Sequence, residues 1–411
     1  MKIGVLTYHC VPNFGAQLQT ISTIGCLMKM GHEPVVLNWY PLELEEMYAK
    51  RIPASQVNIH NKFMNENIPV SKVCRTDQEL ASVIDNLELD AIFEGSDALF
   101  KYIPLKKRTF ISKRKLRLVH LNTSPVDRLE DNCFFGSYFK YLKKRIPLVG
   151  FSISSQNSPY TLMNAKEREM MHSAFSLFKA ISVRDSWTKG MVNSLNPERS
   201  EVRITPDPVF SFNSNCYINI PSKQEVLDKY NLPDNYVLLS FRTSFLSTEY
   251  VQTLASYLKA KSLIPVAFPM PEGLKDFGLE HKIDIPLSPI EWYALIIHSK
   301  GYIGERMHPI VVCVHNSVPF YCFDEYGIST RKFLFFRDYN RSSSKTYHIL
   351  HKAGLEKFMC SYKEKKTIPS PQDAVNVFLG FDKKQCQAFA TSYEQEYKDG
   401  MEYIISNTSV H

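Results

Sequence analysis

The stretch that decides the fold is Gly301-Tyr302-Ile303-Gly304-Glu305-Arg306-Met307-His308-Pro309, which continues as Ile310-Val311-Val312-Cys313-Val314-His315-Asn316. Its first three residues are typical of the end of a short buried strand, and Gly304 allows a sharp turn. Pro309 suits the first turn of a helix, because the N–H that proline lacks would have no partner there. We therefore expect Glu305, Arg306 and His308 between the carboxyl end of a strand and the N-terminus of a helix.

This turn is a candidate site for an anionic ligand. Open α/β sheets bind ligands at the carboxyl ends of their strands, and unpaired N–H groups at a helix N-terminus favour anions. Arg306 would place a fixed cation beside His308, which titrates near neutral pH. Such a pair could hold an acidic substrate and move a proton on it. The spacing alone fits equally well an arginine paired with a nearby carboxylate and a histidine packed at a helix start.

Strands and helices alternate on both sides of the turn. Apolar runs predict strands near residues 2–8, 34–39, 89–94, 147–153, 181–183, 202–204, 236–241, 263–268 and 319–323. No Gly-x-Gly-x-x-Gly follows the first strand, so a nicotinamide cofactor is not supported. The pattern predicts an α/β protein with two Rossmann-like domains facing a cleft, in a glycosyltransferase-B-like architecture. We place the N-terminal domain at residues 1–212, the C-terminal domain at 213–370, and a helical tail that packs back on both at 371–411.

Composition limits the class of protein. The 411 residues are 44% hydrophobic and 22% charged, as in an ordinary water-soluble protein. No apolar run is long enough for a transmembrane helix, and the first residues lack the pattern of a signal peptide. The nine cysteines are scattered without a Cys-x-x-Cys pair, so neither a zinc site nor a disulfide framework is indicated. The cytoplasm is the simplest expected location.

The net charge of +7 is spread unevenly. Residues 101–117 contain eight lysines and arginines and no acidic residue: Lys101, Lys106, Lys107, Arg108, Lys113, Arg114, Lys115 and Arg117. A second basic cluster lies at residues 140–145. We expect the stretch from Lys101 to Arg117 to be a loop or a peripheral helix. It is either a solvated face or a contact for an anionic membrane, at the inner face of the plasma membrane, or for a phosphorylated acceptor. Nucleic acid is not expected, because neither stretch belongs to a known nucleic-acid module.

Several motifs occur together in a fixed order. They are Asn13-Phe14-Gly15-Ala16-Gln17-Leu18-Gln19, Gly95-Ser96-Asp97, Ser182-Val183-Arg184-Asp185, Asp207-Pro208 and Glu305-Arg306-Met307-His308-Pro309. In combination they resemble the polysaccharide pyruvyl transferase family over residues 1–330. The chain has Ala98-Leu99-Phe100 where the family often has Gln-x-Trp, and Ser152-Ile153-Ser154 where many members have Ser-Phe-Gly. Both departures lie in the N-terminal half, so they concern the acceptor more than the donor.

The resemblance implies a reaction and a set of site residues. The enolpyruvyl unit of phosphoenolpyruvate would be transferred to two hydroxyls of a sugar, forming a pyruvate ketal on a cell-surface polysaccharide or its lipid-linked precursor. Phosphoenolpyruvate is then a donor substrate, and no cofactor is expected. The resemblance places Arg184, Arg306 and His308 at the phosphoenolpyruvate site.

The chemistry of the donor agrees with these residue types. Phosphoenolpyruvate carries a carboxylate and a phosphate, so at least two fixed cations are expected, and arginine binds either group through two parallel hydrogen bonds. We expect His308 to be the general acid/base, with its charge tuned by Arg306 and the substrate phosphate. Arg242, at the end of a strand, could meet the phosphate, and Glu305 could orient Arg306 or bind a hydroxyl.

Four further residues are candidates on the acceptor side. Asn13 and Gly15 would shape a helix N-terminus that receives a hydroxyl or a phosphate. Asp97 could accept hydrogen bonds from sugar hydroxyls or simply cap a helix, and Asp207, between two prolines, could be a rigid-turn residue. No set of side chains has the spacing of a metal site, and the chemistry requires no metal.

Two other functions remain open from the sequence. The first is a glycosyltransferase of the same architecture that uses a nucleotide sugar, in which Glu305 could bind the ribose. The second is a non-catalytic relative that binds a glycan or a membrane. Intact Arg184, Arg306 and His308 argue against the second.

Overall fold

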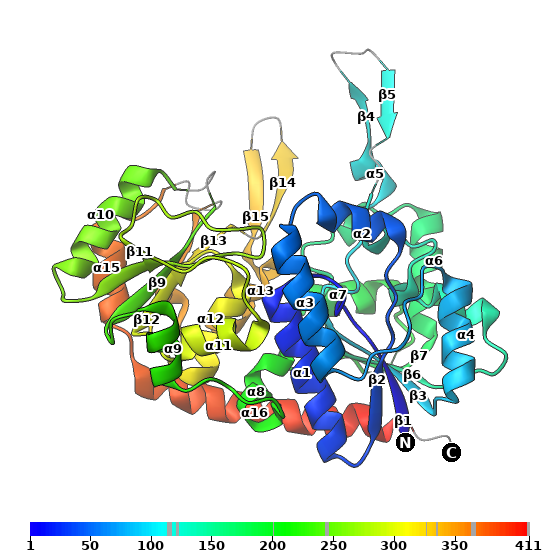
Figure 1. Cartoon of the computed structure of the whole chain (residues 1–411). Coiled ribbons are helices and arrows are strands. Elements are labelled where there is room, and N and C mark those ends of the chain that lie inside the picture. The colour runs from blue at the N-terminus through cyan, green and yellow to red at the C-terminus, as the bar shows by residue number, and fades with distance from the viewer. Residues whose placement is uncertain are drawn as a thin grey trace.

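The computed structural model describes residues 1–112, 117–120, 123–199, 201–242, 246–325, 327–333, 336–362 and 367–408 (Figure 1). The described chain forms two six-stranded sheets with helices packed around each. The basic residues Lys113, Arg114 and Lys115, on which part of the predicted membrane contact rests, lie outside the described residues.

The N-terminal sheet has the strand order β2-β1-β3-β6-β7-β8, and every pairing in it is parallel. Its strands are β1 (Lys2–Leu6), β2 (Glu33–Val36), β3 (Ala91–Asp97), β6 (Leu148–Ile153), β7 (Phe178–Val183) and β8 (Arg203–Ile204). All residues of β3 and β6 are buried, as expected for central strands covered by helices on both faces. The carboxyl end of β3 therefore delivers Asp97 to one edge of this sheet.

The C-terminal sheet has the order β11-β10-β9-β12-β13-β16 and is also parallel. Its strands are β9 (Tyr236–Ser240), β10 (Ile264–Ala267), β11 (His281–Lys282), β12 (Gly301–Gly304), β13 (Phe320–Asp324) and β16 (Met359–Ser361). Strand β12 lies in the middle and leads directly into the Glu305–His308 turn. The Glu305–His308 turn is thus at the carboxyl edge of this sheet.

Helices connect and cover the strands. Around the N-terminal sheet they are α1 (Phe14–Lys29), α2 (Leu42–Ala49), α3 (Ala54–Asn67), α4 (Asp77–Leu87), α6 (Ala165–Ser176) and α7 (Ser186–Leu195). Around the C-terminal sheet they are α9 (Lys223–Tyr230), α10 (Thr248–Lys259), α11 (Pro289–Ile297), α12 (Met307–Asn316), α13 (Lys345–Lys352) and α15 (Pro371–Leu379). A capping box of Ser288 and Glu291 opens α11, and Asp185 caps α7.

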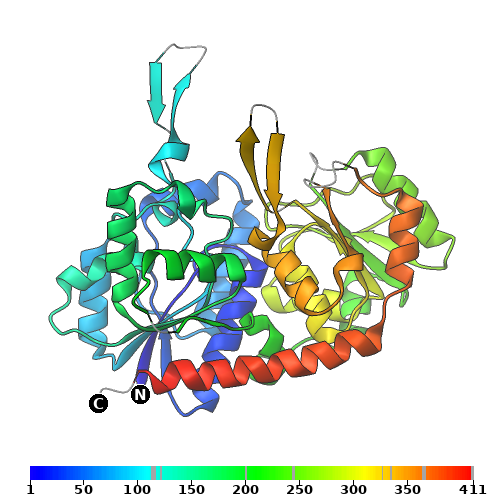
Figure 2. The ribbon, with the colours of Figure 1, turned by 180° about the vertical axis from the view of Figure 1, so that it is seen from behind.

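The two halves share a continuous apolar core. Phe14 of α1 stacks on Trp292 of α11, with ring centroids 5.2 Å apart, and both rings are buried. The long helix α16 (Lys383–Ser406) returns from the C-terminal half and runs beneath both sheets to end near the N-terminus (Figure 2). The fold is therefore α/β with two facing Rossmann-like domains, glycosyltransferase-B-like as predicted. The boundary predicted between residues 212 and 213 falls at the start of α8 (Phe212–Asn215), between the two sheets.

Two β-hairpins stand apart from the six-stranded sheets. One follows α5 (Leu105–Arg108) and pairs β4 (Thr109–Ser112) with β5 (Arg117–His120); the other pairs β14 (Ile328–Phe333) with β15 (Phe336–Asn340). The expectation of a loop or peripheral helix was therefore wrong for residues 109–112 and 117–120, because apolar cross-strand pairs favour an antiparallel hairpin there. Among the described residues, every helix is too short or too polar to cross a lipid bilayer.

Candidate active site

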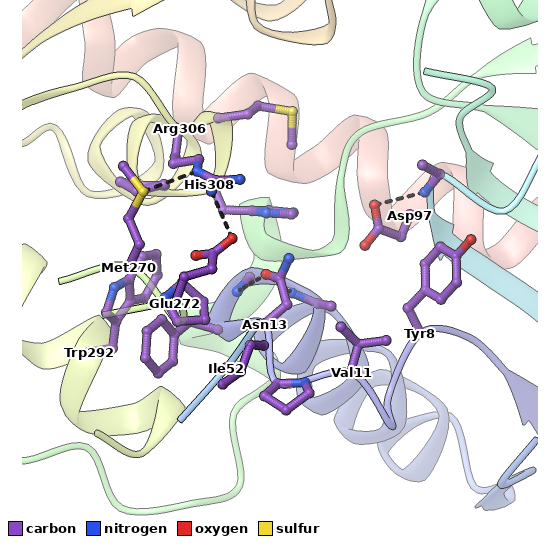
Figure 3. Close-up of a pocket in the computed structure, with 18 of the residues that line it drawn as sticks. Tyr8, Val11, Asn13, Ile52, Asp97, Met270, Glu272, Trp292, Arg306 and His308 are labelled. Atoms are coloured by element: carbon purple, nitrogen blue, oxygen red, sulfur yellow. Dashed lines mark hydrogen bonds and ion pairs between the residues drawn. The ribbon is translucent and has the colours of Figure 1, made fainter. Parts of the chain in front are cut away.

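A cavity of about 380 Å³ lies between the two sheets. Three helix N-termini contribute to its wall: α1 through Asn13 to Ala16, α12 through Arg306 to Pro309, and α13 through Lys345 and Thr346. The carboxyl end of β3 adds Asp97. Figure 3 shows Met270, Glu272 and Trp292 on one side of this space and Tyr8 and Asp97 on the other. Partial positive charge at each helix N-terminus makes the cavity suited to an anionic ligand.

Arg306 is the residue that precedes α12, and its side chain reaches the cavity. Its Nη2 donates to Glu272 Oε1 at 3.0 Å, and its Nε lies 3.4 Å from Met270 Sδ (Figure 3). The ion pair is partly exposed, with about a third of the arginine side chain accessible (32%). An arginine held this way keeps its charge at the cavity wall, and an anionic ligand can compete with Glu272 for it.

His308 is buried at the first turn of α12 and lines the same cavity. Burial lowers the pKa of His308 to about 4; Arg184 and Lys345 lower it as well, while Asp207 and Asp97 act in the opposite direction. Its Nε2 has no hydrogen-bond partner among the described residues. The imidazole is therefore neutral near pH 7, and an incoming negative charge would raise its pKa.

Gly15 in the first turn of α1 packs directly against His308. A Cβ at Gly15 would lie 2.0 Å from His308 Cγ, 2.2 Å from Nδ1 and 2.5 Å from Cβ. No real carbon contact is this short, so only glycine leaves room for the imidazole. Gly15, expected from the sequence on the acceptor side, therefore lies against His308 of the opposite domain.

Asn13 caps α1 and faces the cavity. Its Oδ1 accepts hydrogen bonds from the backbone N–H groups of Gly15 at 3.1 Å and Ala16 at 3.4 Å. Two of the N–H groups that could have received an acceptor oxygen are therefore already satisfied by this side chain. Its amide nitrogen is the part of Asn13 that can serve a ligand.

Asp97 and Lys345 bring opposite charges from the two domains together. Lys345 Nζ lies 3.9 Å from Asp97 Oδ1, and each side chain is 11% exposed. Burial would raise the pKa of Asp97, but Lys345 and Arg184 hold it below the usual value. Burial lowers the pKa of Lys345 to about 8, with a further decrease from Arg184 and an opposing effect from Asp97. Lys345 is thus a cation at neutral pH whose charge depends on its surroundings.

Arg184 lies behind Asp97 and is not among the residues that line the cavity. Its guanidinium is ion-paired with Asp207, and its Nη2 is 3.6 Å from Asp97 Oδ1. Asp207 also accepts from Gln19 Nε2 at 2.6 Å and caps a short helix through Val209 N. Arg184 and Asp207 are fully buried. Arg184 therefore helps to hold Asp97 in place, and the charges of Arg184 and Asp207 both shift the pKa of His308.

Arg242 and Glu305 form a separate network. The Arg242 Nε is bonded to Glu305 Oε1, and its Nη2 is bonded to Glu325. Burial raises the pKa of Glu305, and Arg242 opposes the rise. Neither residue lines the cavity. The structure therefore pairs Arg242 with two carboxylates at the position where the sequence analysis expected it to be open to phosphate.

Of the nine predicted residues, the structure brings Asn13, Gly15, Asp97, Arg306 and His308 to one cavity. Sequence reasoning missed Lys345, which follows Ser342-Ser343-Ser344 without any motif to mark it. It also missed Gln19, although this residue ends the Asn13–Gln19 motif, and that position was the available signal. No group of three or more residues arranged to hold a metal ion occurs in the described part of the chain.

A family model described as polysaccharide pyruvyl transferase matches residues 13–325. The chain belongs to the polysaccharide pyruvyl transferase family. This match includes all the residues that line the cavity except those before Asn13 and the two from α13. No curated protein matches the sequence.

Three solved structures are similar to the chain over nearly its whole length. They are UDP-N-acetylglucosamine 2-epimerases. The enzyme from Rickettsia bellii has a TM-score of 0.54 at 10% identity and covers 99% of this chain and 96% of that chain. The enzyme from Neisseria meningitidis, bound to UDP-GlcNAc, has a TM-score of 0.52 at 10% identity and covers 99% of each. The enzyme from Methanocaldococcus jannaschii has a TM-score of 0.50 at 10% identity and covers 95% of this chain and 99% of that chain. At such low identity the likeness shows the fold alone.

Proposed function

We propose that this pyruvyl transferase moves the enolpyruvyl unit of phosphoenolpyruvate onto two hydroxyls of one sugar, with release of phosphate. The acceptor is a cell-surface polysaccharide or its lipid-linked precursor, modified on the cytoplasmic side of the membrane. The observation that carries the proposal is His308, a neutral buried imidazole whose Nε2 has no partner among the described residues, in a cavity that also holds Arg306 and Lys345.

Two cations are available to the donor. Arg306 can exchange Glu272 for the carboxylate or phosphate and make two parallel hydrogen bonds to it. Lys345 lines the same cavity and offers a point charge, since its ion pair with Asp97 is long at 3.9 Å. The N-termini of α12 and α13 add partial positive charge in the same place. Arg184 contributes through Asp97 and does not need to touch the donor.

The proton balance of the reaction fits one group that both accepts and donates. A proton is added to the terminal methylene carbon of the donor, and the first sugar hydroxyl attacks the adjacent carbon and loses its own proton. The C–O bond to phosphate then breaks, and the second hydroxyl attacks the same carbon and loses its proton. One proton is consumed and two are released, so the second departs with phosphate or into water. His308 can shuttle the first, and such a group typically contributes about 10²–10⁴-fold.

The acceptor has space on the N-terminal side of the cavity. Tyr8, Tyr48, Arg51, Lys101 and Gln156 line this part, which offers hydroxyl, amide and cationic groups to a sugar. Asp97 faces the same space and is held ionised by its cations, so it can accept hydrogen bonds from sugar hydroxyls. The predicted contact of residues 101–117 with an anionic membrane belongs to this proposal, because a lipid-linked acceptor would be met there.

The deciding experiment is to incubate the protein with phosphoenolpyruvate and a panel of short soluble glycans and to follow phosphate release and the mass of the product. We expect phosphate and a ketal-bearing sugar in equal amounts. His308→Ala should lower turnover by a factor of about 10²–10⁴ while donor binding largely survives. Release of phosphate without ketal, or turnover with a uridine diphosphate sugar in place of phosphoenolpyruvate, would reject the proposal in favour of another transferase.

A further inference from the structure

The two hairpins leave the body of the protein in the same direction. In both views the β4–β5 and β14–β15 hairpins extend beyond the sheets on the same end of the molecule (Figures 1 and 2). Each forms a sheet of only two strands and joins neither of the six-stranded sheets. A lone two-stranded hairpin is at best marginally stable in water, so a contact with something outside the chain would favour both.

The segment made of α5 and the first hairpin has a basic excess equal to the net charge of the whole protein. Residues 105–120, Leu-Lys-Lys-Arg-Thr-Phe-Ile-Ser-Lys-Arg-Lys-Leu-Arg-Leu-Val-His, contain seven lysines and arginines and no acidic residue. The whole chain has 49 basic and 42 acidic residues, so the remaining 42 basic residues are balanced by 42 acidic ones. Lys106 and Lys107 of α5 are exposed, and Leu105 beside them is 44% exposed. This end of the molecule therefore attracts anionic surfaces.

The second hairpin is also basic. The sequence of β14 and β15 contains Arg331, Lys332 and Arg337 against the single acid Asp338, and the register places Arg331 opposite Arg337. An anionic partner would therefore be attracted to this hairpin as well. Both hairpins also pair apolar residues across their strands: Phe110 with Val119, Ile111 with Leu118, and Phe333 with Phe336. Basic and apolar residues together fit a lipid surface better than a nucleic acid, which offers no apolar phase.

Both hairpins are connected by short segments to residues that line the active-site cavity. Lys101 lines the cavity and is four residues before α5, which leads into β4. Lys345 lines it from the other domain and is five residues after the end of β15. A surface that receives both hairpins would therefore face the cleft between the two domains.

We infer that the two hairpins form a two-point membrane contact that seats the enzyme on an anionic lipid surface with its cleft toward the headgroups. The lipid contact itself stands on the charge and register of the hairpins alone. Its consequence for the reaction rests on the proposed function: the acceptor sugar is then presented to the cavity by a lipid anchor. The contact includes a hairpin from each domain, so it extends well beyond residues 101–117.

The test is co-sedimentation of the full chain, without substrates, with vesicles of phosphatidylcholine alone or mixed with phosphatidylglycerol. We expect binding only to the mixed vesicles, and weakening by salt. The double variants K106Q/K107Q and R331Q/R337Q should each lose affinity by roughly 25-fold, at about fivefold for each charge removed. The matched control is K143Q/K144Q, which removes two exposed lysines near the amino end of β6, at the opposite edge of the sheet, and should bind like the wild type.

Three results would overturn the inference. They are equal binding to neutral and mixed vesicles, an equal loss of affinity in the control variant, or unchanged binding of R331Q/R337Q, which would show that the second hairpin does not contact the membrane. Melting temperatures of all variants identify any that fail to fold, and for these a single substitution of each pair is measured. Wild-type phosphate release with a short soluble glycan tests the proposed function separately, since that assay contains no lipid.

Discussion

Replacing Gly15 with alanine tests the contact that joins the two domains at the active site. The added Cβ would fall 2.0–2.5 Å from three atoms of the His308 side chain. Ordinary carbon contacts are about 3.5–4.0 Å, so the imidazole must move by more than about 1 Å or the domains must separate. Gly15 is on α1 and His308 on α12, so either response changes the shape of the cavity.

The size of the effect follows from this overlap. Overpacking of a buried contact typically costs about 1–3 kcal/mol, so we expect Gly15→Ala to unfold at lower denaturant concentration. A displacement of about 1 Å at a catalytic group can lower the rate by about 10²-fold. We therefore expect the loss in turnover to exceed what the loss of stability explains, because the variant is still folded at the assay temperature.

The assay combines phosphate release with urea unfolding, and two comparisons make it specific. Gly380→Ala is the matched glycine control, since its Cβ would be no closer than 3.4 Å to Val377 O, an ordinary contact. The second comparison repeats Gly15→Ala in a His308→Gly background, where the three overlapping atoms are absent. There the cost in unfolding free energy should nearly vanish. Wild-type turnover in Gly15→Ala, or an equal stability cost in both backgrounds, would refute the reasoning.

Four further predictions concern buried charges and the contact between the two domains. Burial raises the pKa of Glu94, which has no partner among the described residues, so the folded state keeps its proton and stability falls as pH rises above the ordinary glutamate value. Glu94→Gln should therefore raise the free energy of unfolding at pH 8 but not at pH 4. The gain is about 1.4 kcal/mol for each unit by which the pKa is raised, and urea unfolding measures it. The Gln56 side chain makes two hydrogen bonds of 2.9 Å to the backbone of Leu287 in the other domain. Gln56→Ala leaves both backbone groups without a partner, so it should lower the free energy of unfolding by about 2 kcal/mol or more in the same assay. Lys345→Met should weaken phosphoenolpyruvate binding at least tenfold in calorimetry, because a hydrogen bond to a charged group usually contributes about 1.5–3 kcal/mol. The control is Lys352→Met, at an exposed lysine, which should bind like the wild type. Equal affinities in the two variants would show that Lys345 is not part of the donor site. Binding of phosphoenolpyruvate should take up a proton at pH 6–7, seen as a heat that depends on the ionisation enthalpy of the buffer, and no such dependence would contradict the assignment to His308.

The fold was predictable because its signals are local. The central strand β3 is buried along its whole length, and a continuous apolar run is what a parallel sheet demands of its sequence. The start of α11 follows from Ser288 and Glu291, which satisfy each other's backbone groups without help from the rest of the chain. Strand ends and helix starts then fixed where Asp97, Arg306 and His308 would lie.

What could not be predicted depends on packing between distant segments. The end of β7 correctly delivers Arg184 to the carboxyl edge, but the sequence does not say whether its side chain turns to the cavity or to Asp207, to which it is bonded. Lys345 reaches Asp97 only because α13 of one domain packs against the other domain. The first hairpin was missed because its short apolar pairs are separated by basic residues, which weakens the alternation that marks a strand.

The buried charged groups around the cavity serve ligand binding more than stability. Arg184 and Lys345 are balanced by Asp97 and Asp207, and His308 is neutral, so these five groups together carry almost no net charge. Burying such pairs contributes little to stability, because the cost of removing them from water offsets their attraction. Their value lies in the response to a ligand: a donor with two or three negative charges finds Arg306 and Lys345 in place, and its field raises the pKa of His308. The donor would thus bring the catalytic proton into the site by its own charge, which ties proton supply to occupancy.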